Sequence, residues 1–259
     1  MDLNLSDKVI IVTGGARGIG ESIVRKLANE SAIPCIIDIN QQLADNLVNT
    51  LQQNNQQGFA VIADLTQPEQ CKKAIDNIIE KFGSLDGIVN NAGLNDGVSL
   101  ENGTYEKFIQ SLKVNAAHYF SITYYALNAL KNSKGSIVNI CSKVAQTGQG
   151  GTSGYAAANG VRFGLTTAWA QELAAFNIRV NAIVVAECYT PQYDWWIKQQ
   201  TDPEASLNAI ISKIPLEQRM TLPDEIADTA LFLLSSKSTS VNGEFFYVDG
   251  GYVHLDRRI

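Results

Sequence analysis

A serine and a tyrosine stand where one predicted element ends and the next begins, near the middle of the chain. Ser142 follows an apolar run at residues 136–140, and Tyr155 opens the next helical pattern. Oxidation of an alcohol requires a group that takes the hydroxyl proton while hydride leaves the carbon, and a tyrosine can do so once its pKa falls from about 10 toward neutrality. Taken alone, the two residues are better explained by a role in the fold, with Tyr155 packing at a helix start and Ser142 acting as a cap.

Short apolar runs alternate with helical patterns along the chain, and these elements would position the two residues. We predict strands at residues 9–12, 34–38, 59–63, 87–89, 136–140, 179–185 and 244–248. We predict helices at residues 18–30, 40–53, 67–82, 105–130, 155–176 and 224–235. This alternation requires right-handed crossovers and a parallel sheet. The sequence therefore predicts an α/β, Rossmann-like, doubly wound fold, in which a seven-stranded parallel sheet is flanked by helices and residues 1–259 form a single domain.

A glycine-rich turn lies between the first predicted strand and the first predicted helix. Residues 13–20 read Thr-Gly-Gly-Ala-Arg-Gly-Ile-Gly, a G-x-x-x-G-x-G spacing rather than the commoner G-x-G-x-x-G. Glycines allow a tight turn and a close approach of a pyrophosphate, and the free N–H groups at the helix start bind that anion. We therefore predict a dinucleotide site that includes Gly14, Arg17, Gly18, Ile19 and Gly20.

An acidic residue, Asp38, ends the second predicted strand, 18 residues beyond Gly20. A carboxylate there can accept hydrogen bonds from the ribose hydroxyls of NAD, and it repels the 2′-phosphate of NADP. The alternative is a structural role at a strand-end turn or as a helix cap. Arg17 is the one feature that favours NADP, because an arginine beside the site can pair with the phosphate. We predict NAD as the cofactor.

These features belong to an ordered set of motifs that resembles the short-chain dehydrogenase/reductase family from Lys8 to Tyr252. The motifs are residues 13–20, Asp64-Leu65, Asn90-Asn91-Ala92-Gly93, Asn115, Ser142, Tyr155 and Val248-Asp249-Gly250-Gly251. Each motif is common alone, whereas the ordered set is specific. The resemblance implies an oxidoreductase that uses a nicotinamide cofactor and commonly assembles as a tetramer through isologous contacts.

The resemblance also implies which residues surround the cofactor. Asp64 and Leu65 would border the adenine. Asn91, Ala92 and Gly93 would stabilise the sheet and line the cofactor cleft.

Further roles implied by the resemblance concern the reacting end of the site. Asn115 would hold a water in a proton relay, Ser142 would hydrogen-bond the substrate oxygen, and Tyr155 would be the general acid/base. Ile183 and Thr190 would contact the nicotinamide half, Thr190 through the carboxamide.

One position departs from the family pattern Tyr-x-x-x-Lys, because residues 155–159 read Tyr-Ala-Ala-Ala-Asn. A lysine on this helical face would bind the nicotinamide ribose and favour the ionised tyrosine by its charge. Asn159 could keep hydrogen bonding but not the charge, and a loss worth about 2 pH units would leave ~100-fold less phenolate near neutral pH. We expect a weakened dehydrogenase in which Asn159→Lys changes turnover and its pH profile.

Two alternatives remain open at this position. The chain could be a variant of an active parent, or an NAD-binding protein with little or no catalysis. Lys143 follows Ser142, but a neighbour on a strand end points elsewhere and is a poor substitute for the lysine. Arg162 lies two turns beyond Tyr155 and could approach the site, although we expect it to face solvent or a partner subunit.

The segment after the sixth predicted strand, about residues 186–215, is predicted to form a substrate lid. Residues 186–197 read Ala-Glu-x-x-Thr-Pro-x-Tyr-x-x-Trp-Ile and resemble the L-fucose dehydrogenase-like branch of the family. Asn95, Gln149 and Glu187 could contact a sugar, and Trp195 could stack on its face. This predicts oxidation of an aldose at its anomeric carbon to a lactone; the alternative is a helix whose Trp and Tyr residues pack on the core.

The composition argues against several other classes of protein. The 259 residues carry a formal net charge of −6 and no run rich in lysine and arginine, so we expect no nucleic-acid partner. No apolar stretch reaches the ~18 residues of a membrane span, and the short polar N-terminus is not a signal peptide, so we expect a cytoplasmic protein without a membrane partner.

The cysteines and histidines give no metal-ligand spacing, and we predict no metal site. His118 and His254 are expected to be structural. The widely spaced cysteines are expected to be buried free thiols: Cys35, Cys71, Cys141 and Cys188. Aromatic residues of the helices at 105–130 and 155–176 could form subunit interfaces or face only the sheet: Tyr119, Phe120, Tyr124, Phe163 and Trp169.

Overall fold

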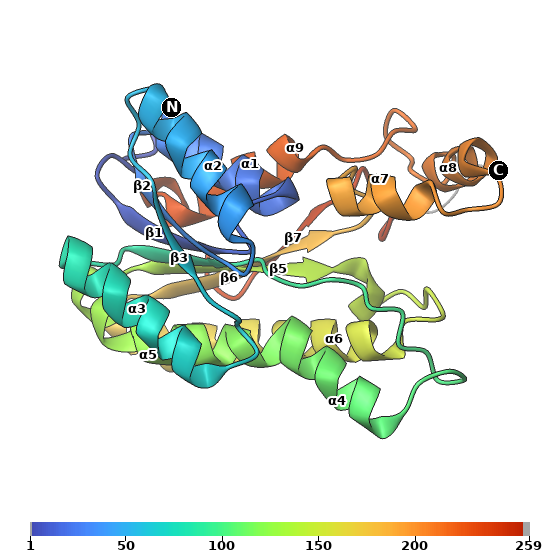
Figure 1. Ribbon diagram of the computed structural model, residues 1–259, viewed down its shortest axis with the longest axis horizontal. Coiled ribbons are helices and arrows are strands. Elements are labelled where there is room, and N and C mark those ends of the chain that lie inside the picture. The colour runs from blue at the N-terminus through green and yellow to red at the C-terminus, as the bar shows by residue number, and fades with distance from the viewer. Residues whose placement is uncertain (1, 256–259) are drawn as a thin grey trace.

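Seven parallel strands form one sheet in the computed structural model, which describes residues 2–255 (Figure 1). The strands are β1 (Val9–Thr13), β2 (Ile33–Asp38), β3 (Phe59–Ile62), β4 (Gly87–Asn90), β5 (Ser136–Ser142), β6 (Arg179–Val185) and β7 (Phe245–Val248). Their order across the sheet is β3-β2-β1-β4-β5-β6-β7. The chain thus runs outward from β1 to β3 and then returns to build β4 to β7 on the other side, which confirms the doubly wound prediction. The reversal between β1 and β4 creates the switch point at which such sheets bind ligands.

Helices cover both faces of the sheet (Figure 1). The helices on one face are α1 (Gly18–Asn29), α2 (Gln41–Gln53) and α9 (Pro223–Leu234). Those on the other face are α3 (Pro68–Phe82), α4 (Tyr105–Leu112), α5 (His118–Ser133) and α6 (Ser153–Leu173). Strand side chains alternate between the two layers: Ile10 and Val12 pack with α1, while Val9 and Ile11 pack with α3 and α5. This double burial explains why the strands read as continuous apolar runs.

The prediction of one helix over residues 105–130 was wrong in one respect. The structure divides the segment into α4, a π-helical turn η1 (Lys113–Ala117) and α5. A π-turn widens the helix by one residue and disturbs the regular bonding of its carbonyl groups. Apolar spacing does not reveal it, because the residues before and after the turn still point to the core.

The segment predicted as a lid contains two short helices, α7 (Pro191–Ile197) and α8 (Pro203–Ile211). Its two ends are held together beside the carboxyl end of β6. Cys188 and Thr221 form a parallel bridge, the Thr221 amide donates to the Glu187 carbonyl (2.9 Å), and the Tyr189 amide donates to the Thr221 carbonyl (3.0 Å).

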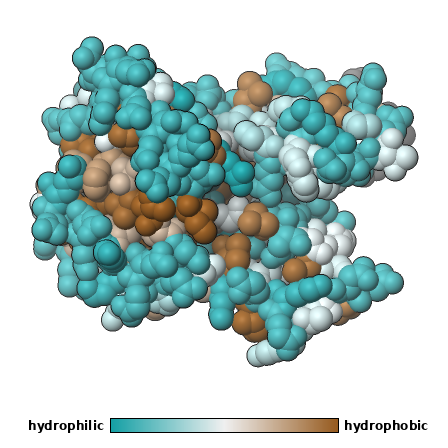
Figure 2. Space-filling model, viewed as in Figure 1, coloured by the Kyte–Doolittle hydropathy of each residue, from teal (hydrophilic) through white to brown (hydrophobic). Residues whose placement is uncertain are grey.

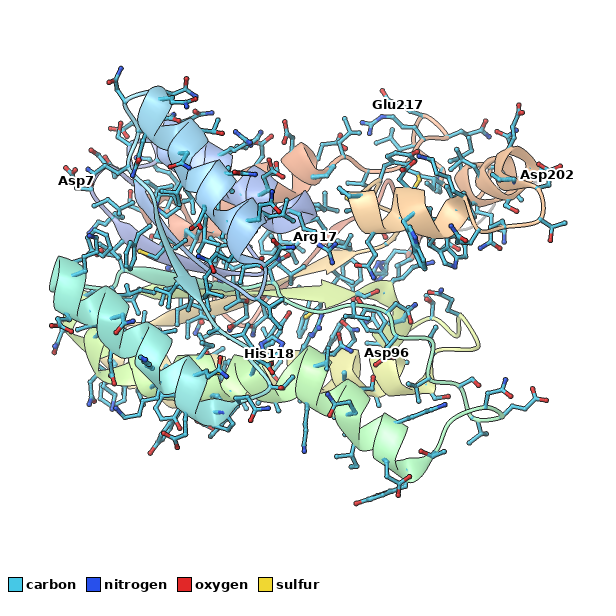
Figure 3. All side chains as sticks on the ribbon, in the orientation of Figure 1. Asp7, Arg17, Asp96, His118, Asp202 and Glu217 are labelled. Carbon is cyan, nitrogen blue, oxygen red and sulfur yellow. The ribbon has the colours of Figure 1, made fainter. Side chains whose placement is uncertain are left out.

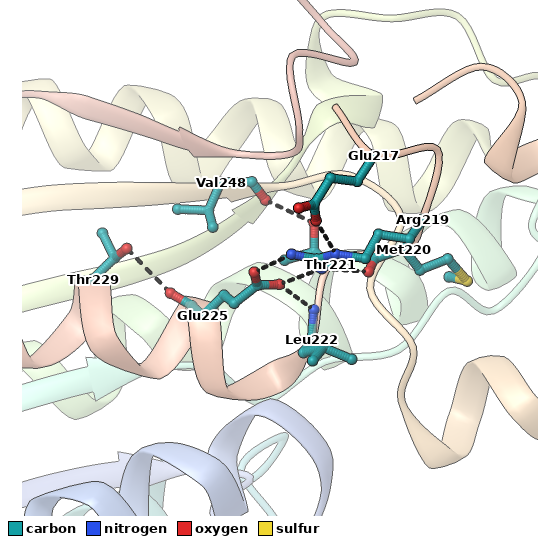
Figure 4. Close-up of polar contacts among 8 residues, drawn as sticks. All are labelled: Glu217, Arg219, Met220, Thr221, Leu222, Glu225, Thr229 and Val248. Carbon is teal, nitrogen blue, oxygen red and sulfur yellow. Dashed lines mark hydrogen bonds and ion pairs between the residues drawn. The ribbon is translucent and has the colours of Figure 1, made fainter. Parts of the chain in front are cut away.

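Further polar contacts fix the returning chain to α9 and β7 (Figure 4). The guanidinium of Arg219 binds both oxygens of Glu225 at 2.6 and 2.9 Å. Thr221 Oγ1 donates to the Val248 carbonyl at 3.4 Å. The excursion from residue 188 to 220 therefore leaves the sheet and returns at fixed points, and α7 and α8 project from it (Figure 1).

All four cysteines are buried and free, as predicted. No helix in the described part of the chain is long and apolar enough to cross a bilayer. Short 3₁₀ turns complete the chain at η2 (Lys143–Ala145), η3 (Ala174–Phe176) and η4 (Ser236–Ser238).

Candidate functional site

The turn between β1 and α1 folds tightly around its glycines. Gly14 and Gly18 have φ angles of 61° and 60°, which glycine adopts without strain. At Gly20 a Cβ atom would lie 2.2 Å from the Gly14 carbonyl oxygen, so the helix starts directly against the turn. The N-cap residue Arg17 makes no side-chain capping bond, which leaves N–H groups of the first helical turn available. A helix start with free N–H groups fits a diphosphate.

Side chains at the carboxyl ends of β1 and β4 hold the shape of this turn. The Asn91 amide donates to the carbonyl oxygens of Thr13 (2.9 Å) and Gly14 (3.1 Å). In return, Thr13 Oγ1 accepts the backbone N–H groups of Asn91 (2.9 Å) and Ala92 (3.1 Å). Asn91 and Ala92 therefore lie where the turn meets the carboxyl end of β4.

The start of α7 lies against the other side of the turn. A Cβ atom on Gly18 would be 3.7 Å from side-chain atoms of Thr190 and Pro191. Figure 3 shows Arg17 beside this helix, at the beginning of α1. Thr190 caps α7 by accepting the Tyr193 amide at 3.2 Å. The structure thus brings Thr190 next to the predicted diphosphate cradle.

Asp38 reaches this cradle from the end of β2. Its Oδ2 accepts the Ala16 amide at 3.1 Å, and its Oδ1 accepts the Asn40 amide at 2.9 Å. A carboxylate has about four acceptor positions, so two stay available for ribose hydroxyls. A neighbouring residue that the sequence prediction missed, Ile39, is 70% exposed and gives this edge an apolar surface.

Asp64 and Leu65 follow β3 at the same edge. Asp64 Oδ1 accepts both the hydroxyl (2.7 Å) and the amide (2.9 Å) of Thr66, and these bonds lower the pKa of its carboxyl group. Leu65 packs on the core below it. The structure therefore places both residues beyond Asp38 on the same side of the sheet.

A chain of buried amides and hydroxyls connects β4 and β5 with α6. Asn90 donates to Asn139 at 3.0 Å, and Asn139 donates to Thr166 at 2.9 Å. Thr166 in turn donates to the carbonyl of Arg162 at 2.8 Å. Such a bonded network fixes the angle at which α6 crosses the sheet.

Ser142, Tyr155 and Asn159 meet at the carboxyl end of β5. Asn159 is fully buried, its Oδ1 accepts the Ser142 amide (2.8 Å), and its Nδ2 donates to the Tyr155 carbonyl (2.9 Å). Ser142 Oγ lies 3.5 Å from the Val144 amide as an acceptor, so its proton is free to donate elsewhere. Both Ser142 and Tyr155 are partly exposed. The buried Asn159 side chain therefore links the backbones of Ser142 and Tyr155.

The expectation that Arg162 faces solvent or a partner subunit was wrong. Arg162 is only 2% exposed, and its Nε donates to the carbonyl of Asn115 at 2.7 Å. Asn115 lies in the π-turn, where an uneven bonding pattern leaves carbonyls for such partners. The sequence held a signal for this, because Tyr155, Asn159, Arg162 and Thr166 follow i, i+4, i+7 and i+11 spacing on one helical face.

Asn115 itself is fully buried and makes two kinds of contact. Its side-chain Oδ1 accepts the Leu94 amide at 2.8 Å, while its backbone carbonyl is bound by Arg162. The Nδ2 atom is buried and has no partner among residues 2–255.

A buried ion pair that the sequence did not predict lies near the root of α7. The Lys143 ammonium pairs with Glu187, and the two side chains are 7% and 13% exposed. The hydroxyl of Tyr193 donates to the second oxygen of Glu187 at 2.9 Å, and burial together with this carboxylate raises the pKa of Tyr193. Both oxygens of Glu187, a predicted sugar contact, are therefore engaged within the protein.

The other predicted sugar contacts lie on exposed segments. Asn95 Oδ1 accepts the Gly97 amide at 3.2 Å, Gln149 lies in the exposed loop after η2, and Trp195 is 65% exposed on α7. Figure 2 shows a deep hollow between the arm formed by α7 and α8 and the layer that contains α4 and α6. Two other hollows, of about 420 and 510 Å³, contain none of the predicted site residues.

The fold and this edge of the sheet are those of a nucleotide-binding α/β protein of the oxidoreductase class. A family model described as enoyl-(acyl carrier protein) reductase matches residues 14–253. The chain belongs to the short-chain dehydrogenase/reductase family, whose members are oxidoreductases that typically bind NAD(P).

Three similar proteins illustrate the range of this family. The chain is 33% identical over 252 residues to 3-oxoacyl-[acyl-carrier-protein] reductase FabG of Thermotoga maritima, covering 97% of this chain and all of the relative. It is 32% identical to L-fucose dehydrogenase of Bos taurus, over 97% of this chain and 91% of the relative. The crystal structure of Cj0485 dehydrogenase superposes with a TM-score of 0.94 at 39% identity, covering 100% of this chain and 99% of the other.

Proposed function

We propose that this chain is an NAD(H)-dependent oxidoreductase that oxidises a hydroxyl-bearing small molecule, an aldose such as L-fucose. One observation carries the proposal: Asp38, the uncapped start of α1 and the Ser142–Tyr155 pair meet along one edge of the sheet. A diphosphate, a ribose diol and an alcohol can be bound together only where such groups converge.

The cofactor would lie across the switch point. Its diphosphate fits the free amides after β1, and its adenosine ribose fits the remaining acceptor positions of Asp38. The carboxylate favours NAD, since it repels the 2′-phosphate of NADP. The residues proposed to hold the dinucleotide are Gly14, Arg17, Gly18, Ile19, Gly20, Asp38, Asp64, Leu65, Asn91, Ala92, Gly93, Tyr155, Asn159 and Thr190.

The reaction would centre on Tyr155 as general base. The bound nicotinamide supplies the hydride acceptor. Ser142 holds the substrate oxygen through its free hydroxyl proton, and Tyr155 takes the proton of that oxygen as hydride leaves the carbon. Asn115 and Asn159 contribute by position: Asn159 links the Ser142 amide to the Tyr155 carbonyl, and Asn115 anchors Arg162 behind the tyrosine.

An aldose is the substrate class supported best. L-fucose dehydrogenase is among the relatives that match nearly the whole chain, and residues 186–215 would close over the hollow as a lid. Asn95, Gln149 and Trp195 would contact the sugar from separate segments, and Glu187 would use the acceptor positions that its bonds to Lys143 and Tyr193 leave free. Oxidation at the anomeric carbon would give a lactone.

The test is a screen for NAD reduction with a panel of aldoses, run at neutral and alkaline pH. NADP in place of NAD and the Tyr155→Phe variant serve as controls. We expect turnover with NAD and at least one aldose, and ~100-fold less in the variant. Reduction of NAD with another class of alcohol, and with no aldose, would contradict the aldose proposal.

A second candidate, an NAD-binding protein without catalysis, is favoured by one observation. Asn159 uses its amide for contacts inside the protein and brings no charge to the site. Calorimetry with NAD and NADH separates the candidates, because heat of binding without turnover of any alcohol would support this one.

We further propose that the protein acts in the cytoplasm as a homotetramer. Phe120 and Tyr124 stack on each other on α5 and are 53% and 60% exposed, and Val161 on α6 is 41% exposed. In contrast, Tyr119 and Trp169 are buried against the sheet. Isologous contact between copies would cover the exposed group, and light scattering of the purified protein tests the mass.

A further inference from the structure

A buried arginine without a carboxylate partner lies behind the proposed general base. Arg162 is 2% exposed. Its Nε and Nη1 donate to three neutral oxygens: the carbonyl of Asn115 (2.7 Å), the carbonyl of Ile140 (3.1 Å) and Oδ1 of Asn159 (3.2 Å). Among residues 2–255 it forms no ion pair. A buried charge that meets only neutral partners is costly to keep, so a nearby group that can become anionic would be strongly stabilised.

The titratable groups that face Arg162 come from α5, β5 and α6. Burial raises the pKa of Tyr119, and it raises the pKa of Cys141 to about 12. Burial, with a smaller effect of Arg162, lowers the pKa of His118 to about 3, so this imidazole is neutral. These three side chains are at most 1% exposed, whereas Tyr155 is partly exposed. Tyr155 is therefore the group here that can exchange a proton with a ligand and become anionic.

The geometry brings the guanidinium close to that phenol. Arg162 Cζ lies 5.8 Å from the ring centroid of Tyr155 and 4.6 Å from that of Tyr119. Its remaining nitrogen, Nη2, is buried and has no hydrogen-bond partner in the described chain. Burial lowers the pKa of Arg162, but Tyr119 and Tyr155 outweigh this effect, so its pKa is raised and the charge is permanent.

The unpartnered nitrogen points to the loop that follows β4. A Cβ atom on Gly93 would lie 2.5 Å from Arg162 Nη2, so only glycine leaves room for the guanidinium at this place. The neighbouring candidates for a positive charge do not serve: Asn159 is neutral, and Lys143 is paired with Glu187.

We infer that Arg162 supplies the fixed positive charge that stabilises the ionised form of Tyr155, so that Asn159 and Arg162 together replace the single lysine of the family pattern. This inference rests on the proposed function, since it concerns the proton acceptor of that reaction. Arg162 acts through Tyr155 and is a positioning residue. Asn159 contributes by binding Nη1 of Arg162 and the amide of Ser142 with one oxygen.

The first test needs no cofactor. Ultraviolet absorbance follows phenolate formation with pH, and subtracting the curve of Tyr155→Phe from that of the parent isolates Tyr155. The Arg162→Gln variant keeps a hydrogen-bond donor but not the charge. In this variant, with Tyr155 isolated by the same subtraction, we expect the midpoint of phenolate formation to rise by about 2 pH units, equivalent to ~100-fold less phenolate at a given pH. A folded Arg162→Gln protein with an unmoved curve would overturn the inference.

The second test uses turnover and a charge swap. The rise of kcat/KM with pH in alcohol oxidation reports the ionisation of the base in the free enzyme, and Arg162→Gln should move it upward with activity recovering at high pH. The double variant Asn159→Lys/Arg162→Leu returns the charge to the family position, and it should titrate like the parent. If Arg162→Gln does not fold, the double variant serves as the test. A higher pH midpoint for Tyr155 ionisation in the double variant than in the parent would contradict the inference.

The matched control is Arg179→Gln. Arg179 also binds neutral oxygens, those of Leu233, Ser235 and Ser238, but at the opposite edge of the sheet. Its loss should lower stability without moving either titration. A parent protein that turns over no alcohol at all would contradict the proposed function. The phenolate curves would still test whether Arg162 stabilises the ionised form of Tyr155.

Discussion

The Asp38 carboxylate accepts the backbone amide of Ala16 at 3.1 Å, across the space between the end of β2 and the turn after β1. The residue proposed to select the cofactor therefore also shapes the turn proposed to bind its diphosphate. Changes at Asp38 should act on both, and variants that differ only in charge can separate the two effects.

Asp38→Asn should weaken the preference for NAD over NADP while leaving the fold intact. The amide oxygen can still accept the Ala16 amide, but the variant loses the charge that repels a 2′-phosphate and that strengthens hydrogen bonds to the ribose. Hydrogen bonds to charged groups contribute about 1.5–3 kcal/mol, which corresponds to a ~10- to 100-fold change in the ratio of the two dissociation constants. Calorimetric titration with both cofactors measures it.

The matched control for this change is Asp86→Asn. Asp86 also accepts a backbone amide, that of Val9 at 3.0 Å, but it lies at the amino edge of the sheet. Its loss should leave the ratio unchanged. An unchanged ratio in Asp38→Asn as well would show that Asp38 has only a structural role.

The overall fold was accessible from the sequence, whereas part of the site was not. Strands buried on both faces, such as β1 and β5, are recognisable in the sequence as apolar runs, and the glycines after β1 indicate the turn. Local patterns therefore recovered the order of elements and the position of Ser142 and Tyr155.

Arg162 and the Lys143–Glu187 pair escaped because their roles depend on contacts between distant segments. The guanidinium of Arg162 donates to a carbonyl 47 residues away, in a π-turn that apolar spacing does not reveal. Glu187 is 44 residues from Lys143 and looked like a free ligand group. The helical spacing indicated the face on which Arg162 lies, but the partners that its guanidinium meets there could not be read from the sequence.

Asn159→Lys alone should destabilise the protein and slow it, rather than repair it. The new ammonium would lie beside the Arg162 guanidinium, whose Nη1 is 3.2 Å from Asn159 Oδ1, and the Ser142 amide would lose its acceptor. An uncompensated buried charge costs about 3–5 kcal/mol, and urea unfolding measures it. The loss should be recovered largely in Asn159→Lys/Arg162→Leu. A single variant that is as stable as the parent and faster would contradict this account.

The buried His118 should make the folded state sensitive to acid. Burial lowers its pKa from 6.5 to about 3, so between these values the unfolded chain binds a proton that the folded chain does not. Stability from this group is complete above the unfolded value and is lost as pH falls toward 3, by about 1.4 kcal/mol per pH unit. His118→Gln should flatten the dependence between about pH 6 and pH 4, as followed by urea unfolding.

The control for His118 is the exposed imidazole of His254. His254→Gln should leave the slope of unfolding free energy against pH unchanged. Equal slopes in the parent and in His118→Gln would mean that protonation of His118 does not limit acid stability.

Variants of the Lys143–Glu187 pair should separate an effect on stability from an effect on substrate binding. Lys143→Met leaves the Glu187 carboxylate buried beside Tyr193 without its cation, which should cost about 3–5 kcal/mol of unfolding free energy. The double variant Lys143→Met/Glu187→Met removes both charges, and replacement of a buried pair by apolar groups is often close to neutral. Stability should therefore return in the double variant.

Activity should not return with stability if Glu187 faces the sugar. We expect the double variant to unfold like the parent and yet to show a KM for the aldose raised about 10-fold or more, since a buried charged hydrogen bond to a ligand contributes about 1.5–3 kcal/mol. Its affinity for NAD should stay within a few-fold, because Asp38 and the backbone amides of the turn after β1 are unchanged in this variant. A double variant with parental stability and parental KM would assign the pair to the root of α7 alone and remove Glu187 from the proposed substrate contacts.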